Sequence, residues 1–381
     1  MRRSADAVIV GGGCMGASVA FHLARRGMTD VVLVERESQL GTGSTGRNAG
    51  GVRHQFSHEA NIRLSIESIR ALEQFEDLTG LAIDLHLDGY LFLLSAPASV
   101  DTFRRNVDVQ RACGVTVDWL TADEAERLAP GISADGVLAA TFCARDGIAD
   151  PNGVTMGFAK AAQQMGVTIA RDTEVTAVTT NGGRVTGVET SRGAVSAPVV
   201  VNAAGPYACP VGDMAGVRVP VDPYRRHIFI TNAATGVPAS KIMVIDFDTT
   251  FYFHREGPGV LFGMGDRDET PTFDMTVQWD FLPTVIDVAV RRLPALQDAA
   301  ISHAWAGLYE VTPDANPLIG ESSLPGFYLI TGFSGHGFQH SPAAGRILAD
   351  LITGADPKMD LRPFSPARFD GAPIRGERYV V

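Results

Sequence analysis

Apolar and polar positions follow a regular order over the first 35 residues. Ala7–Val10 and Val31–Val34 are unbroken apolar runs of strand length, and residues 15–26 between them have the length of a helix and end before Gly27. Parallel neighbouring strands need a crossover of about a dozen residues, usually a helix. The pattern therefore predicts a βαβ unit at the start of the chain, which is typical of a parallel sheet.

Helical periodicity and capping residues predict further helices. Residues 62–78 carry apolar side chains near helical spacing, and Gly80 follows as a residue suited to a helix end. Thr121 opens a capping-box pattern, and Asp150 with Pro151 is typical of an N-cap and first turn. The predicted helices therefore cover residues 15–26, 62–78, a short segment after 121, 151–165, 276–291 and 342–353.

Strand-like segments dominate the middle of the chain. Residues 167–202 resemble short strands with a hairpin turn at Asn181 and Gly182, and residues 217–265 are rich in β-branched and aromatic side chains. The charge-free stretch 193–212 contains prolines that would leave backbone groups unsatisfied in lipid, so we expect a buried strand and turn there. The predicted fold class is α/β with an inserted, mainly β region.

Composition restricts the class of protein further. The 381 residues suggest two or three domains at roughly 150 residues each, and 45% hydrophobic with 20% charged residues are typical of a soluble globular protein. A net charge of −11 argues against broad binding to nucleic acid or anionic membranes. The four cysteines lie far apart without a CxxC pair, which excludes a zinc ribbon and favours a reducing compartment. Arg2 and Arg3 resemble the start of a signal peptide, but Asp6 and the following glycines interrupt it, so we expect a cytoplasmic protein.

A glycine motif follows the first predicted strand. Gly11, Gly13 and Gly16 form GxGxxG at the start of the first helix. Glycine serves here in a tight turn, in the close approach of backbone to a pyrophosphate and in helix–strand packing, while the helix N-terminus attracts the phosphates. Glu35 ends the second strand, where a carboxylate accepts hydrogen bonds from ribose hydroxyls and disfavours a 2′-phosphate. These features predict a dinucleotide site.

Three further glycine-rich segments bear on which dinucleotide is bound. They are GTGSTGRNAGG at 41–51, VVNAAGPY at 200–207 and GFSGHG at 332–337. A long, bent cofactor that is contacted by many loops needs this number of close backbone approaches. The distribution of glycines favours FAD over a nicotinamide cofactor.

The order of these motifs resembles the D-amino-acid oxidase superfamily of FAD-dependent oxidoreductases, with TPDANPLIG at 312–320 as a fifth segment. RHQFSHEANIRLSIES at 53–68 is most similar to the branch of the sarcosine oxidase β-subunit, dye-linked proline dehydrogenase and glycine oxidase. The resemblance implies a Rossmann-like FAD-binding domain and a second, mainly β substrate domain with an antiparallel or mixed sheet plus helices. We expect the FAD-binding domain at 1–84, 143–215 and 302–381, and the substrate domain at 85–142 and 216–301.

The resemblance also implies which residues bind FAD. The glycines of the GxGxxG motif and Glu35 are expected at the ADP half of FAD, and Val175 at the adenine. The other glycine-rich segments are expected along the flavin and its phosphates. A histidine packed between glycines is the alternative interpretation of His336. The expected cofactor-binding residues are Gly11, Gly13, Met15, Gly16, Glu35, Arg36, Ser44, Thr45, Arg47, Asn48, Ala49, Gly50, Val175, Ala204, Gly205, Gly307, Gly332, Ser334, Gly335, His336, Gly337 and Phe338.

The two positions that carry a covalent flavin in relatives are changed in this sequence. Gly307 matches the cysteine of monomeric sarcosine oxidases, and Arg47 matches the histidine of dimethylglycine dehydrogenases. Neither residue can form such a bond. The resemblance therefore implies non-covalent FAD.

The resemblance implies hydride transfer to flavin from the carbon beside an uncharged amine. Arg53 matches a carboxylate-binding arginine, with an ion pair to a nearby acid such as Glu59 as the alternative. Gln339 replaces a second carboxylate-binding lysine, which leaves room for a substrate other than sarcosine. Tyr252 and His254 match positions over the substrate, or are ordinary strand residues. The expected substrate-site residues are Arg53, Tyr252, His254 and Gln339.

The electron acceptor stays open. Leu261 stands where monomeric sarcosine oxidases have a lysine that promotes reaction with oxygen, so oxidase and dehydrogenase are both possible. Arg225 and Arg226 are either surface arginines or part of a basic segment near the domain junction. The histidines show no ligand spacing, and we predict no metal.

Three hypotheses of function follow from the resemblance. The first is FAD-dependent oxidation of a small secondary or N-methylated amino acid of the sarcosine, dimethylglycine or proline type. The second is a D-amino-acid or glycine oxidase or dehydrogenase that acts on primary amines. The third is a flavin-bearing β-like subunit of a hetero-oligomeric amine dehydrogenase complex. The expected partners are a small amino-acid-like carboxylate, oxygen or an electron-transfer acceptor, and further copies or other subunits of an oligomer, without nucleic acid and without a transmembrane segment.

Overall fold

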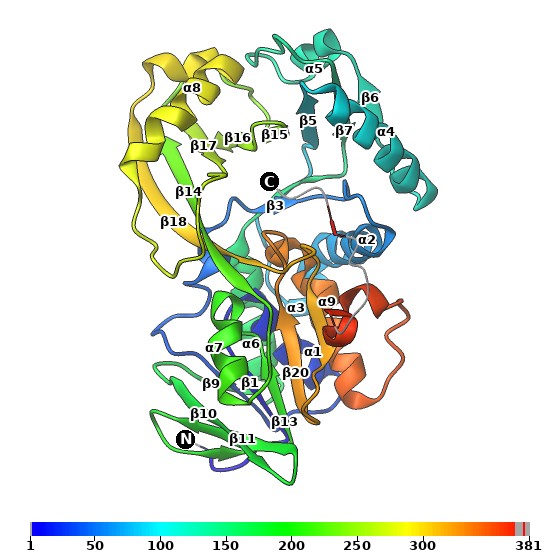
Figure 1. The fold of residues 1–381 in the computed structure, drawn as a ribbon, viewed down its shortest axis with the longest axis vertical. Coiled ribbons are helices and arrows are strands. Elements are labelled where there is room, and N and C mark those ends of the chain that lie inside the picture. Colours follow the sequence, from blue (N-terminus) through cyan, green and yellow to red (C-terminus); the bar gives the residue numbers. More distant parts are fainter. Residues whose placement is uncertain (1, 370–375, 378–381) are drawn as a thin grey trace.

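The computed structural model describes residues 2–369 and 376–377. One half of the molecule is built on a six-stranded sheet with the order β19-β20-β13-β1-β2-β9 (Figure 1). All neighbours in this sheet are parallel except β19 and β20. Its strands are β1 (Ala7–Val10), β2 (Val31–Val34), β9 (Thr168–Ala170), β13 (Val199–Asn202), β19 (Leu318–Glu321) and β20 (Phe327–Thr331).

Two different layers cover the faces of this sheet because successive strand residues point to opposite sides. Ile9 and Leu33 belong to a core shared with helices, whereas Val8 and Val32 belong to a core shared with a three-stranded sheet and α7. The helices of the first core are α1 (Cys14–Arg25), α2 (Glu59–Glu73), α3 (Phe75–Thr79), α6 (Pro151–Gln164) and α9 (Gly337–Thr353). The second layer consists of α7 (Ala208–Met214), β10 (Val175–Asn181), β11 (Arg184–Thr190) and β12 (Val195–Ser196).

The other half is built on an eight-stranded sheet with the order β18-β14-β17-β16-β15-β5-β7-β6. Its pairs are antiparallel except β15 with β5. Phe229, Phe253 and Phe262 pack on one face against α5 (Ala122–Leu128) and α8 (Leu282–Arg292), and α4 (Pro97–Ala112) packs near β5. The strands are β5 (Tyr90–Leu94), β6 (Asp118–Leu120), β7 (Ala139–Cys143), β14 (Asp222–Thr231), β15 (Met243–Asp246), β16 (Phe251–Glu256), β17 (Gly259–Met264) and β18 (Ile301–Val311).

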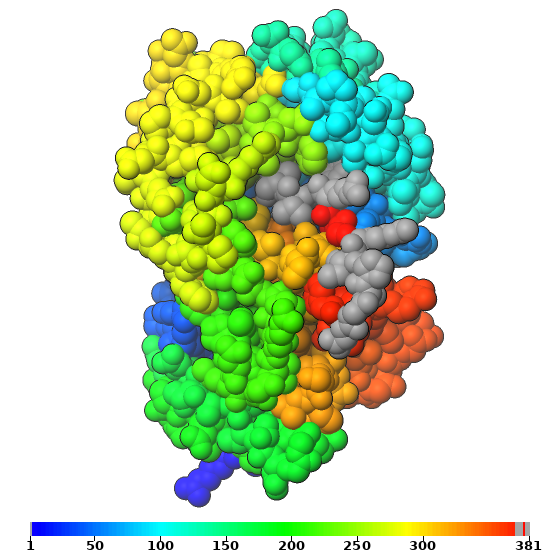
Figure 2. Space-filling model, viewed as in Figure 1, coloured from blue at the N-terminus to red at the C-terminus, as the bar shows by residue number. Residues whose placement is uncertain are grey.

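The two halves form the two ends of the molecule, with the cyan and yellow segments at one end and the green and orange-red segments at the other (Figure 2). A small sheet of β3 (Gly51–Val52), β8 (Gly147–Ala149) and β4 (Leu85–His86) is the fourth sheet in the described part of the chain. The predicted α/β class with a second, mainly β part is confirmed. The predicted domain boundaries stay a prediction, and β18 crosses the one at residue 302.

The helix predicted at residues 62–78 is wrong in one respect, because it is two helices. α2 and α3 are separated at Gln74, whose φ of −105° and ψ of 18° leave the helical region. After this break Phe75 packs against Phe158 of α6, with the ring centroids 4.9 Å apart. Gly80 ends α3 in the left-handed conformation, at φ 76°, as the sequence predicted.

The predicted start of the last helix at Pro342 is also wrong, because α9 begins at Gly337 and contains Pro342. A proline removes one backbone donor and normally ends or kinks a helix. Here the residues before it are buried, including Phe338 and Gln339, so packing offsets the lost hydrogen bond. The segment GFSGHG therefore runs directly into a helix N-terminus.

Smaller differences concern a turn and a helix start. The hairpin between β10 and β11 turns at Gly182 and Gly183, one residue later than predicted, with φ of 56° and 76°. Two positive φ values match the turn that a two-residue hairpin favours. Helix α8 begins at Leu282 after a short 3₁₀ turn, later than the predicted 276. Across the described ranges, no helix is both long and apolar enough to cross a membrane.

Candidate active site

A cavity of about 570 Å³ lies at the carboxyl ends of β1 and β2 and extends to the eight-stranded sheet. Val10 and Val34 end those two strands and line it, together with the loops that follow them. Ligands of open α/β sheets bind at this edge of the strands. The volume lies within the usual range of about 300–1,000 Å³ for small-molecule sites.

The GxGxxG loop after β1 has glycine at two positions where another backbone segment comes too close for a side chain. Gly11 has a φ of 110°, and a Cβ on it would collide with the carbonyl oxygen of Ala203. A Cβ on Gly16 would collide with the carbonyl oxygen of Gly11. Gly11 therefore lines the cavity, while Gly16 allows the helix to pack on the loop without lining the cavity itself.

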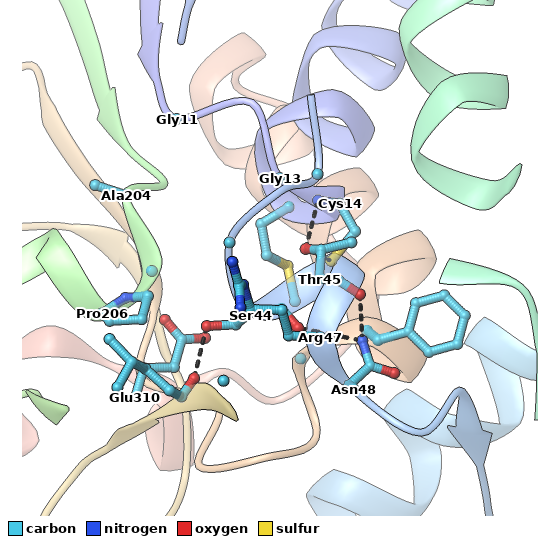
Figure 3. A pocket seen from close by; sticks show the side chains of 18 of the residues that line it. Gly11, Gly13, Cys14, Ser44, Thr45, Arg47, Asn48, Ala204, Pro206 and Glu310 are labelled. Atoms are coloured by element: carbon cyan, nitrogen blue, oxygen red, sulfur yellow. Dashed lines mark hydrogen bonds between the residues drawn. The ribbon is translucent and has the colours of Figure 1, made fainter. Parts of the chain in front are cut away.

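Helix α1 points an open N-terminus into the cavity. Gly13 is its N-cap and offers no side-chain cap, and the first turn contains no acidic residue. The backbone N–H of Cys14 donates to Oγ1 of Thr45 at 3.2 Å (Figure 3). The first turn itself contributes no negative charge, so the positive end of the helix dipole suits a phosphate group.

Glu35 and Arg36 define the part of the cavity near β2. The Glu35 carboxylate accepts the backbone N–H of Gly12 at 2.7 Å and that of Glu37 at 2.9 Å. Arg36 lies over the ring of Tyr207, 3.9 Å from its centroid. These contacts hold a carboxylate and a guanidinium–aromatic pair at the end expected for adenosine.

The second glycine-rich loop is docked on β18. Ser44 Oγ donates to the carbonyl oxygen of Leu308 at 2.6 Å, and Nη1 of Arg47 donates to that of Ala306 at 3.0 Å. Asn48 Nδ2 donates to the carbonyl oxygen of Thr45 at 2.6 Å within the loop (Figure 3). A Cβ on Gly307 would lie 2.9 Å from Cβ of Arg47, so the two positions expected to carry a covalent flavin in relatives meet here without a nucleophile.

A second helix N-terminus opens on the same cavity. His336 is the N-cap of α9 without a side-chain cap, and Gly337, Phe338 and Gln339 line the cavity with it. Glu310 lies beside this turn and accepts the backbone N–H of Phe333 at 3.3 Å. Burial raises the pKa of the Glu310 carboxyl, which three hydrogen-bond donors oppose only in part.

Arg53 is buried on the cavity wall. Its Nη2 lies 3.0 Å from Nε2 of His336, and its Nη1 donates to the carbonyl oxygen of Gln55. Since a guanidinium only donates, Nε2 of His336 accepts and this histidine is neutral. The Arg53 guanidinium also lies 4.1 Å from the ring centroid of Phe56. The alternative ion pair with Glu59 is not formed, because Glu59 pairs with Arg63.

Gln339 holds the backbone of Arg53. Its Oε1 accepts the Arg53 backbone N–H at 2.7 Å, and its Nε2 lies 3.2 Å from Nε2 of His340. His340 in turn lies 2.9 Å from Oγ of Ser65. Burial, and then the charge of Arg53, lower the pKa of His340 to about 3, so this histidine stays neutral. Both ends of the Gln339 amide are therefore engaged within the protein, although its side chain also borders the cavity.

Three of the tyrosines that line the cavity each pack on a glycine. A Cβ on Gly51, Gly263 or Gly335 would collide with Tyr90, Tyr252 or Tyr309, respectively. Burial raises the pKa of all three phenols. They therefore present protonated hydroxyl groups at neutral pH.

Five of the expected site residues do not line the cavity. His254 is buried outside the lining, with Nε2 3.1 Å from the carbonyl oxygen of Ala49, so it supports the glycine-rich loop at 41–51, and its expected place over the substrate stays a prediction. Burial lowers its pKa, and the carbonyl oxygens of Arg255 and Ala49 oppose this shift. Leu261 is buried but also outside the lining. The other expected residues outside the lining are Gly16, Gly50, Gly332 and Ser334.

The cavity brings together the remaining expected residues and adds several that sequence reasoning missed. Tyr90, Tyr309 and Glu310 were not expected, and Arg226 was left between a surface and a functional role. Tyr90 begins a strand that is otherwise apolar and fully buried. Its hydroxyl group needs a hydrogen-bond partner when buried, and this was the signal in the sequence that could have indicated a site residue. The expected residues in the lining are Gly11, Gly13, Met15, Glu35, Arg36, Ser44, Thr45, Arg47, Asn48, Ala49, Arg53, Val175, Ala204, Gly205, Tyr252, Gly307, Gly335, His336, Gly337, Phe338 and Gln339.

One group of possible metal ligands exists among the described residues, formed by His54, Cys143 and Asp146, all buried. Asp146 Oδ1 lies 2.7 Å from Nδ1 of His54, and Oδ2 accepts from Gln55 at 3.2 Å. Burial raises the pKa of the Cys143 thiol, which opposes the thiolate that a metal requires. The Asp146 carboxylate therefore has hydrogen-bond partners within the protein and needs no metal to explain its burial. The absence of a metal stays a prediction.

Comparison with known proteins identifies the class to which this fold and cavity belong. The chain matches the family described as FAD dependent oxidoreductase (DAO) over residues 6–351, and it belongs to that family. It is 33% identical to the FAD-dependent oxidoreductase domain-containing protein 1 of Xenopus laevis, over 99% of this chain and 85% of that protein. It is 30% identical to human mitochondrial sarcosine dehydrogenase over 96% of this chain, but it spans only 41% of that protein.

Solved structures give the same result. L-proline dehydrogenase from P. horikoshii superposes with a TM-score of 0.91 at 34% identity, covering 98% of this chain and 100% of that one. Glycine oxidase from Geobacillus kaustophilus superposes with a TM-score of 0.86 at 26% identity, covering 97% and 100%. The protein is an FAD-dependent oxidoreductase with a DAO-family fold.

The residues present fit FAD. Two helix N-termini open on one cavity, and neither N-cap residue makes a side-chain cap hydrogen bond. Gly11 has no side chain that would project into the cavity. Glu35 stands at the end of β2, where a ribose would be bound. A dinucleotide with two phosphates matches this set of donors and acceptors.

Proposed function

We propose that the protein oxidises a small secondary or N-methylated amino acid of the sarcosine, dimethylglycine or proline type, with FAD as the hydride acceptor. The observation that carries this proposal is Arg53, which is buried on the wall of the FAD cavity beside the neutral His336. Similarity supports it, since relatives at 30% or more identity are named sarcosine dehydrogenase and L-proline dehydrogenase.

Each part of the cavity has a role in this reaction. FAD, when bound, accepts the hydride from the carbon beside the amine. Arg53 binds the substrate carboxylate with its planar fork, and Gln339 positions Arg53 through its backbone. The apolar side chains of Ile228, Met243 and Ile245 exclude water from the reacting C–H bond.

The same proposal covers the cofactor and the partners of the protein. FAD is bound without a covalent bond by the expected residues that line the cavity, because Gly307 and Arg47 offer no attachment atom. The electron acceptor is oxygen or an electron-transfer protein, and the chain acts as a homo-oligomer or beside other subunits. Its compartment is the cytoplasm.

Anaerobic bleaching of the flavin tests the substrate class. We expect sarcosine, N,N-dimethylglycine or proline to reduce the flavin of the purified holoenzyme, and we expect Arg53→Gln to slow this reduction at least about 10-fold through the loss of a charged hydrogen bond. Glycine and D-alanine are the primary-amine controls. If only these primary amines bleach the flavin, the proposed substrate class is wrong.

A further inference from the structure

Two neighbouring arginines of β14 have different surroundings. Arg225 points away from the cavity, with Nε 3.0 Å from Oε2 of Glu269 and Nη1 2.7 Å from Oδ2 of Asp274. Arg226 points to the opposite face, as successive strand residues do, and lines the cavity. In the part of the chain that the structure describes, no carboxylate lies within 4.0 Å of the Arg226 guanidinium.

The contacts of Arg226 leave hydrogen-bonding capacity unused. Its Nη1 donates to the carbonyl oxygen of Arg225 at 2.8 Å, and its guanidinium lies 5.1 Å from the ring centroid of Tyr309. Its Nε is buried and has no hydrogen-bond partner among the described residues. A buried charged donor without an acceptor is unfavourable, so this side chain is suited to an anionic ligand group.

Arg53 and Arg226 act on the same region of the cavity. The ring of Tyr309 lies between the surroundings of the two arginines, because its centroid is 5.1 Å from the Arg226 guanidinium and its edge packs on Gly335. The next residue, His336, has its Nε2 3.0 Å from Nη2 of Arg53. The charges of both arginines accordingly oppose the rise that burial causes in the pKa of Tyr309. Tyr252 adds another hydroxyl to the lining in this region. The cavity thus offers two cationic groups and at least two phenol donors to one small molecule.

We propose that the preferred substrate carries two carboxylates, one bound by Arg53 and the other by Arg226. This inference rests on the proposed function and narrows it to N-substituted amino acids with a second acidic group. Arginine binds carboxylate through two parallel hydrogen bonds, so each site selects for charge and for geometry. Arg226 is then a specificity-determining residue.

The test uses ligands that cannot be oxidised at nitrogen. Thiodiacetate and 3-(carboxymethylthio)propanoate carry two carboxylates around a sulfur atom, and (methylthio)acetate carries one. Their dissociation constants are measured from the change in the absorbance of oxidised flavin in the holoenzyme. We expect at least one dicarboxylate to bind about 10-fold or more tightly than (methylthio)acetate, the size of one charged hydrogen-bonded contact.

Variants assign this preference to Arg226. We expect Arg226→Gln to reduce the ratio of the two dissociation constants about 10-fold or more, Arg226→Lys to reduce it less, and Arg53→Gln to weaken both ligand classes. Arg291→Gln, at an exposed position of α8, changes the net charge equally and should leave the ratio unchanged. Flavin content and melting temperature show that each variant is folded, and Arg226→Lys carries the test if the glutamine variant loses FAD.

The outcomes separate the two proposals. Equal binding of both ligand classes by the unmodified holoenzyme, or an equal loss of both in Arg226→Gln, overturns the role of Arg226. If the role of Arg226 is overturned in this way but N-methyl amino acids still reduce the flavin, the proposed function stays intact. A preference that depends on Arg226, without reduction by any secondary amine, supports the two-carboxylate site and overturns the proposed reaction.

Discussion

Burial keeps several histidines of this protein neutral. His22 lies inside α1, with its ring centroid 5.0 Å from that of Phe21 and 5.9 Å from that of Phe158. Burial, and then Arg26 and Arg25, lower its pKa from 6.5 to about 3. The neutral form is therefore part of the packed core between α1 and α6, and a proton on His22 would be unfavourable there.

His22 predicts how stability depends on pH. Below pH 6.5 the unfolded chain binds a proton at this histidine and the folded protein does not, so stability falls as the pH falls from about 6.5 towards 3. The slope is about 1.4 kcal/mol per pH unit for one such group. In urea unfolding between pH 7.5 and 4.5, His22→Gln should have a shallower dependence by this amount. His303→Gln, at an exposed position, is the control, and equal slopes in the two variants would contradict the prediction.

At the scale of elements, the interruption between α2 and α3 decides a packing contact. Phe75 begins α3 and lies directly over Gly157 of α6, where a Cβ would collide with the ring. The glycine is thus required by an aromatic neighbour, in spite of a cost of about 1 kcal/mol relative to alanine inside a helix. Helical periodicity predicted the apolar face of residues 62–78, but it could not predict that the ring of Phe75 packs on Gly157 of α6.

Replacement of Gly157 tests this contact. Gly157→Ala should destabilise the protein by about 1–3 kcal/mol, because overpacking outweighs the gain in helix propensity. Phe75→Leu in the same chain should recover part of that loss by removing the ring. A double-mutant cycle from urea unfolding measures the coupling, and additive effects of the two substitutions would show that the ring and the glycine do not interact.

At the scale of the whole molecule, a protein with a net charge of −11 contains a cavity that is suited to anions. Arg47, Arg53 and Arg226 line it, and the N-termini of α1 and α9 open on it. The negative net charge of the whole protein therefore does not predict the sign of the charge inside the cavity. Both sheets contribute to the cavity walls, so a bound cofactor contacts both ends of the molecule and stabilises the folded state as a whole.

Removal of FAD should lower the stability of the protein. Free FAD at 100 times its dissociation constant should stabilise the folded protein by about 2.7 kcal/mol, so the melting temperature should rise with FAD concentration. NAD⁺ at the same concentration is the control. After precipitation in acid, the flavin should remain in the supernatant. A pellet that keeps the yellow colour would show a covalent bond and contradict this expectation.

The sequence by itself determined the βαβ start, the dinucleotide motif and the capping box at Thr121, because each depends on residues close together in the chain. The order of the glycine-rich segments can also be read directly from the sequence. The sequence also indicated Arg53. It did not show that α9 begins at Gly337, since burial offsets the effect of Pro342.

Only the tertiary structure decided which side chains meet. His254 was directed to Ala49 instead of the cavity, and Gln339 to the backbone of Arg53. Arg225 and Arg226 look alike in the sequence, but the pairing of β14 turns one to acidic partners and the other to the cavity. Contacts between distant segments depend on strand register and side-chain packing, which local patterns do not encode.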